Sequence, residues 1–131
     1  MVILLAKKTQ SQLNQQEREE LILSLEKQIA AAVWLQAIGN IAEAILVSKL
    51  LLIKEEVQGD TKVVTGIWVQ TIGQVMEAIG VTKQIEAVDP SIIFDAQRLT
   101  IMGDILQSVG AAVEAIGGKQ ILQSEQEGFI P

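Results

Sequence analysis

A pattern of ten residues, Gln-x-[Ile/Val]-Gly-x-x-x-Glu-Ala-Ile, occurs three times along the chain. The copies cover residues 36–45, 70–79 and 107–116, and their glycines are spaced by 34 residues (39 to 73) and 37 residues (73 to 110). Repeats of this length are typical of helical units that stack on copies of themselves. The pattern therefore predicts that one helical segment was copied twice and that the copies pack on one another.

Two turn signals separate the copies. Gln58-Gly-Asp-Thr61 lies between the first and the second, and Asp89-Pro90-Ser91 lies between the second and the third. Asp and Thr cap helix N-termini well, so Asp60 or Thr61 and then Asp89 are the expected caps, and proline suits the first helical position. Short connections make neighbouring helices antiparallel. The prediction is an all-α fold of three antiparallel helices.

The expected domain is a single helical unit over residues 1–131. A long first helix is predicted from about Ser11 to Val57, with residues 1–29 as a polar N-terminal extension that projects beyond the body and residues 30–57 as the first repeat helix. The second and third repeat helices are predicted over residues 61–88 and 90–123, and Gly117-Gly118 is expected to weaken the last one.

Glycine recurs at seven-residue intervals inside these predicted helices. A glycine in a helix costs about 1 kcal/mol relative to alanine, and close approach of a second backbone can offset that cost. Two tryptophans at matching repeat positions are interpreted as paired packing groups at a helix contact, with anchoring at a membrane surface as the alternative. The residues predicted to form helix contacts and assembly surfaces are Gly39, Gly66, Gly73, Gly80, Gly103, Gly110, Gly117, Trp34 and Trp68.

Glutamine and glutamate share one polar position of the repeat. They are interpreted as a polar stripe or a polar seam, and proton handling and metal binding are the alternatives. The sequence has no His and no Cys, so a di-metal bundle built on Glu-x-x-His pairs is excluded, and so is a thiol nucleophile. We predict no enzyme activity, no catalytic residue, no cofactor and no metal. The polar positions are Gln36, Glu43, Gln70, Glu77, Gln107 and Glu114.

Apolar residues cover most of the circumference of each predicted helix. Hydrophobic residues make up 49% of the chain and charged residues 20%, against about 25% charged in ordinary domains. Such helices need neighbours on two sides, yet each outer helix of three leaves one flank uncovered. The sequence predicts a structural protein that assembles with itself into a filament, tube or ring. The apolar ends, Val2-Ile-Leu-Leu5 and Phe129-Ile-Pro131, are expected to add contacts.

A membrane-associated or pore-forming protein is the alternative, with Glu43, Glu77 and Glu114 facing a polar lumen. It is the second choice because no stretch of 18 uncharged apolar residues occurs. A formal charge of -6 disfavours nucleic acid as a partner. The start of the chain lacks the features of a signal peptide, so we expect synthesis in the cytoplasm and leave open export by another route or assembly on a cell or spore surface.

Two phrases, Trp68-Val-Gln-Thr-Ile-Gly73 and Val113-Glu-Ala-Ile-Gly117, carry a family resemblance. They resemble the short, glycine-punctuated helical repeats of uncharacterised repetitive proteins from Bacillus-type spore formers. The resemblance extends from Trp34 to Ile121 and implies no activity, cofactor or site residue.

Overall fold

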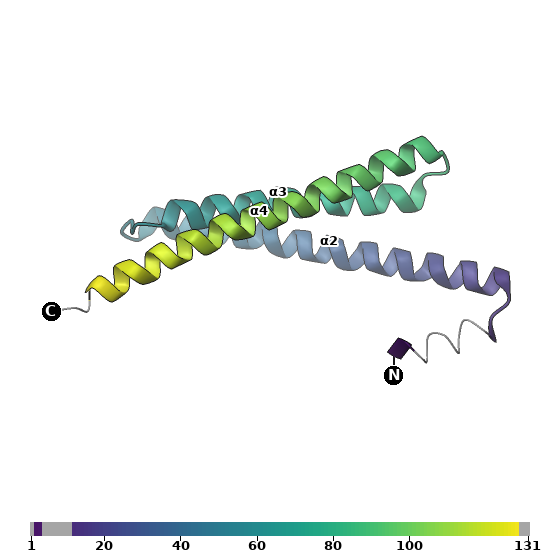
Figure 1. The fold of residues 1–131 in the computed structure, drawn as a ribbon, viewed down its shortest axis with the longest axis horizontal. Helices are drawn as coiled ribbons and strands as arrows, with labels where there is room; N and C mark the ends of the chain where they lie inside the picture. Colours follow the sequence, from purple (N-terminus) through teal and green to yellow (C-terminus); the bar gives the residue numbers. More distant parts are fainter. Residues whose placement is uncertain (1, 4–11, 129–131) are drawn as a thin grey trace.

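The computed structural model describes residues 2–3 and 12–128 of the chain. Over that part it contains three long helices, α2 (Gln15–Ile53), α3 (Asp60–Glu86) and α4 (Pro90–Gly128), joined by short loops. The helices run antiparallel to their sequence neighbours, and α2 and α4 each pack on α3 (Figure 1). The predicted all-α fold of three antiparallel helices is confirmed.

The observed helix ends differ from the predicted ones by a few residues, and the contacts of the residues that flank the helices account for the differences. Helix α2 begins four residues after the predicted start, because the Asn14 side chain accepts a hydrogen bond from the Glu17 N–H at 2.8 Å and caps the helix there. It ends at Ile53 rather than Val57, since Lys54 is already extended. Helix α4 begins at Pro90 as predicted, with the Asp89 carboxylate accepting from the Ser91 N–H at 2.9 Å.

The loop between α2 and α3 is organised by Asp60, which is only 3% exposed. Its carboxylate pairs with Lys54 at 2.9 Å and accepts a hydrogen bond from the Val57 N–H at 2.8 Å. The expectation that Asp60 or Thr61 caps α3 is wrong, because the cap is Gly59 with a φ of 104° and the Asp60 side chain points back into the loop. A left-handed φ favours glycine, and the Gly59 backbone also touches Gly117 of α4.

Helices α3 and α4 approach each other along a ladder of glycines. Six glycines at seven-residue intervals are buried there: Gly66, Gly73 and Gly80 of α3, and Gly103, Gly110 and Gly117 of α4. The contact is reciprocal, since a Cβ added at Gly73 would lie 2.5 Å from the Gly103 carbonyl oxygen and a Cβ added at Gly103 would lie 2.5 Å from that of Gly73. Helix α4 runs without a break through Gly117-Gly118 to Gly128, because Gly117 serves this contact.

A different side of α3 packs on α2, and this contact uses alanine where the other uses glycine. Val33, Ala37 and Ala78 form the buried cluster, with Val75 packed against it. The polar side chains Thr71 and Gln74 are buried in the same contact. Among the described residues, α3 thus packs extensively on two helices, as the sequence predicts, whereas α2 and α4 each pack extensively on α3 alone.

The N-terminal part of α2 diverges from the other two helices (Figure 1). Residues 15–29 are exposed except for the partly covered Arg18. The prediction that this extension makes the first helix much longer than the others is wrong, because α2 and α4 both have 39 residues. Helix α4 gains its length beyond the predicted end at residue 123.

Candidate assembly surfaces

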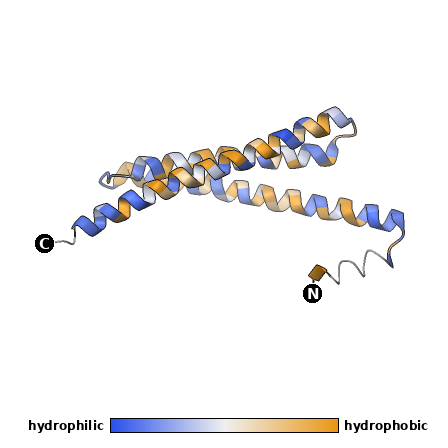
Figure 2. Cartoon of the chain, in the orientation of Figure 1, coloured by the Kyte–Doolittle hydropathy of each residue, from blue (hydrophilic) through white to orange (hydrophobic). Residues whose placement is uncertain are grey.

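The described residues bury small side chains and expose large ones. The buried apolar residues are Ala30, Val33, Ala37, Ala44, Ile67, Ala78 and Ala96, while large apolar side chains lie exposed along all three helices. Figure 2 shows these apolar residues recurring along α2 and along α4. Contiguous exposed apolar area is typical of surfaces that bind proteins or membranes.

On α2 the uncovered surface is what we term the α2 outer face: Ala32, Leu35, Gln36, Gly39, Glu43 and Leu46. All six are exposed, Leu35 by 71% and Leu46 by 64%. The face lies opposite the α2 side that carries Ala30, Ala37 and Ala44 and packs on α3. No atom of a described neighbour lies within 4 Å of a Cβ added at Gly39.

The seven glycines predicted at helix contacts therefore divide into two groups. Six lie in the α3–α4 contact within the chain, so a bulky substitution there would disturb the fold first. Gly39 alone among the seven lies on an open surface, and its contact with a second helix stays a prediction.

The polar repeat positions divide in the same way, between the α3–α4 contact and the α2 outer face. Gln70 donates a short hydrogen bond to Glu114, and Gln107 donates one to Glu77 at 2.7 Å, so the two pairs form a polar seam beside the glycine ladder. These pairs are related by the repeat, since Gln70 matches Gln107 and Glu77 matches Glu114.

The remaining two polar positions, Gln36 and Glu43, are on the α2 outer face. Gln36 accepts a hydrogen bond from Gln74 of α3 at 3.2 Å. Glu43 is exposed and forms no hydrogen bond or ion pair with any described residue. The three glutamates at this repeat position therefore do not converge on one site.

The two tryptophans bridge α2 and α3 through hydroxyl groups that the sequence reasoning missed. Trp34 Nε1 donates to Thr82 Oγ1 at 2.8 Å, and Trp68 Nε1 donates to Ser48 Oγ at 2.9 Å. The matching spacing from 34 to 68 and from 48 to 82 could have revealed the two pairs as a reciprocal antiparallel contact. Both indoles are partly exposed, at 38% and 39%.

On α4 the uncovered surface is what we term the α4 outer face: Asp104, Ser108, Ala111, Ala115 and Lys119. These residues are all exposed. When the glycines of α3 and α4 are aligned, each residue of the α4 outer face corresponds to a residue on the side of α3 that packs on α2. Those α3 residues are Ile67, Thr71, Gln74, Ala78 and Thr82. The α4 outer face is thus small and polar, with one charge of each sign near its ends.

Two open grooves occur at the diverging end of α2. One, of about 430 Å³, is lined by α2 residues alone, among them Glu20, Lys27 and Ala31. The other, of about 280 Å³, lies between Glu26 and Ile29 of α2, Val81 and Ile85 of α3, and Ile93 of α4. Ser24 lines the first groove, and its hydroxyl accepts a hydrogen bond from the Gln28 amide at 3.3 Å. No group of three potential metal ligands occurs among the described residues.

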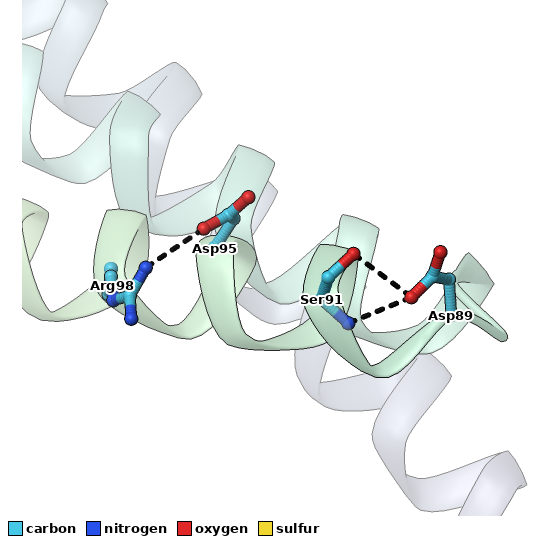
Figure 3. A network of polar contacts seen from close by, with 4 residues as sticks. All are labelled: Asp89, Ser91, Asp95 and Arg98. Carbon is cyan, nitrogen blue, oxygen red and sulfur yellow. Dashed lines mark hydrogen bonds and ion pairs between the residues drawn. The ribbon is translucent and has the colours of Figure 1, made fainter.

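The polar network at the start of α4 has a structural explanation. Asp89 accepts hydrogen bonds from the backbone and the hydroxyl of Ser91, and these bonds hold the pKa of its carboxyl below the ordinary value (Figure 3). Asp95 and Arg98 form a separate exposed ion pair at 3.1 Å on the next turn (Figure 3). The first pair fixes the helix start, and the second contributes little because it is solvated.

Comparison with known proteins gives a match to a protein family. Residues 61–125 match a family of unknown function (DUF6944), and this stretch covers α3 and most of α4. No significant match is found among curated proteins or among solved structures. The similarity therefore applies to the glycine-packed hairpin, and the resemblance to repetitive spore-former proteins stays a prediction.

In the part of the chain that the structure describes, two helices are long and apolar enough to cross a membrane. Helices α2 and α4 each contain an 18-residue window with mean hydropathy of 1.6 and 1.3, of which 22% and 11% of the residues are buried. Length and composition alone are weak evidence, because core helices of other proteins meet the same criteria. This observation bears on the alternative function below.

Proposed function

We propose that this protein is a structural protein that assembles with copies of itself into a filament, tube or ring. The observation that carries the proposal is the reversed distribution of side chains: most of the buried apolar residues are alanines, glycines line the α3–α4 contact, and most of the described leucines and isoleucines are exposed. Burial of apolar surface drives association, and surface not buried within the subunit is available between subunits.

The repeat supplies a reason for polymers rather than dimers. The α2 outer face matches the side of α3 that packs on α4, and the α4 outer face matches the side of α3 that packs on α2. Each subunit therefore has two different uncovered faces at its two edges. Two separate interfaces on one subunit lead to an open filament, or to a ring where the geometry closes.

Sedimentation of the detergent-free protein over a range of concentrations tests this proposal. The expected result is a shift to large species as concentration rises, without added lipid. A sedimentation coefficient that stays at the monomer value up to millimolar protein would contradict the proposal.

The second candidate function is a membrane-associated or pore-forming protein. It is favoured by the two long apolar helices, whose hydropathic windows are mostly exposed. Glu43 within α2 counts against it, because a charged side chain inside a membrane-spanning helix costs up to about 3 kcal/mol. Flotation with liposomes separates the candidates, since only the membrane protein requires lipid to leave the monomeric state.

A further inference from the structure

We propose that the α2 outer face binds the same face of a second copy of this chain, with the two α2 helices antiparallel and related by a twofold axis. The inference rests on the proposed function and specifies one of its contacts. The template is the α3–α4 contact inside each subunit, whose residues recur on α2.

The register follows from the glycine ladder. In that ladder Gly73 opposes Gly103, and Gly66 opposes Gly110. The repeat places Ala32 at the position of Gly66 and Gly103, and Gly39 at the position of Gly73 and Gly110. An antiparallel α2 pair in the same register therefore places Gly39 against Ala32 of the second copy, and the twofold axis repeats the contact.

A glycine opposite an alanine already packs closely within the subunit. Gly80 opposes the buried Ala96, and a Cβ added at Gly80 would lie 2.8 Å from the Ala96 carbonyl oxygen. The Gly39–Ala32 contact requires the same approach. One heptad to either side of this contact, Leu25 of one copy opposes Leu46 of the other. The corresponding positions of α3 and α4 hold smaller residues, so the α2 helices approach most closely at the centre.

The polar residues are complementary in the same register. Gln70 and Glu114, and Gln107 and Glu77, pair across the α3–α4 contact. Their counterparts on α2 are Gln36 and Glu43. The twofold pair would form two Gln36–Glu43 hydrogen bonds between subunits, and these give the exposed Glu43 carboxylate a donor.

The arrangement also accounts for glycine at position 39. The added-Cβ position there is open, so the subunit itself gives no reason for a residue that weakens the helix. Against a second copy, a Cβ at this position would meet backbone, as it would at Gly73. The flanking Leu35 and Leu46, exposed in the single chain, would be covered in the pair.

Cysteine crosslinking tests the register, because the chain has no cysteine of its own. Leu25→Cys and Leu46→Cys are made separately, then oxidised alone and as an equimolar mixture. Antiparallel pairing brings residue 25 of one copy beside residue 46 of the other, so the mixture should give mixed disulfide dimers and each variant alone should give few. Self-dimers of each variant, or no crosslink in a protein that still assembles, would overturn the α2 contact and leave self-assembly standing.

Substitution at Gly39 tests the close approach. Gly39→Leu should weaken the contact by at least about tenfold in dissociation constant, while Ala31→Leu, at an exposed position beside the α2 outer face, should leave the constant unchanged. Circular dichroism checks that both variants remain helical. Equal dissociation constants for Gly39→Leu and the original chain would overturn the inference.

The remaining outcomes separate this inference from the proposed function. A chain that stays monomeric at every concentration contradicts both. Association that occurs only on liposomes of phosphatidylcholine and phosphatidylglycerol, with no mixed disulfide, overturns the α2 pair in favour of lipid as the occupant of this face.

Discussion

At the scale of single residues, identical glycines have different roles because their surroundings differ. Gly73 and Gly39 occupy the same repeat position, yet Gly73 faces the Gly103 backbone and Gly39 faces no described atom. A helical glycine is unfavourable in isolation, so replacement by alanine should have opposite effects at the two positions.

Gly73→Ala should lower the free energy of unfolding by roughly 1–3 kcal/mol, because the new Cβ would meet backbone that cannot move aside as a flexible side chain does. Gly39→Ala should raise it by about 0.5–1 kcal/mol in dilute protein, through helix propensity alone. Urea denaturation followed by circular dichroism measures both. A destabilising Gly39→Ala in dilute protein would show that this position is already packed within the subunit.

Asp60 should make stability depend on pH in the acid range. The Val57 N–H, and then the Lys54 ammonium, hold the pKa of its carboxyl below the ordinary value of 3.8. Because the pKa is lower in the folded state, the ionised carboxylate stabilises the fold fully above the ordinary pKa. This contribution is lost as the pH falls through the folded-state pKa. Stability should therefore decline below about pH 4.

Asp60→Asn removes that titration and the Lys54 ion pair. The variant should be less stable at pH 7 by about 1–2 kcal/mol, and it should lose less stability than the original chain between about pH 4 and pH 2. Thermal unfolding across this range checks both expectations. Parallel pH profiles for the two proteins would show that Asp60 does not carry the acid dependence.

At the scale of helices, α2 should be the least stable element near its N-terminus. Residues 15–29 lie almost entirely in solvent, whereas α3 is covered on two sides. Local opening is easiest where few contacts oppose it. Hydrogen exchange should be fastest in this segment of α2 and slowest in α3 around Gly73; similar protection in both would contradict the packing described for α2.

The helices and their antiparallel order were predictable because turn residues and caps are local signals. Asp89 and Pro90 start α4 as expected. The end of α2 was not predictable, because it depends on the ion pair between Lys54 and Asp60. That pair forms only once the loop is folded, so no local sequence signal marks it. Gly117 was expected to weaken α4, yet the Gly59 backbone packed against it explains why the helix continues.

The sequence predicts that the glycine positions form close helix contacts, but it does not predict which helices meet at each glycine. Seven-residue glycine spacing indicates close helix contacts, but it does not say which copy meets which. Gly66 and Gly73 face the backbone of α4, whereas Gly39 faces no described atom because it lies on the side of α2 that points away from α3. The Trp34–Thr82 and Trp68–Ser48 bonds were missed because each joins residues of different types far apart in sequence.

At the scale of the whole molecule, one helix packs between two others, which form the edges. Helix α3 packs on α4 with one side and on α2 with another, and among the described residues α2 and α4 each leave one side uncovered. Such a subunit resembles a segment taken from a larger array of helices. Under the proposed function, further copies of the chain cover these two edges, as neighbouring repeats cover one another in solenoid proteins.

The most direct measurement is negative-stain electron microscopy of the purified, detergent-free protein without lipid. We expect regular filaments, tubes or rings, because the uncovered faces of α2 and α4 would be buried between subunits. Small uniform particles at every concentration, or ordered assemblies that form only when liposomes are added, would contradict this expectation.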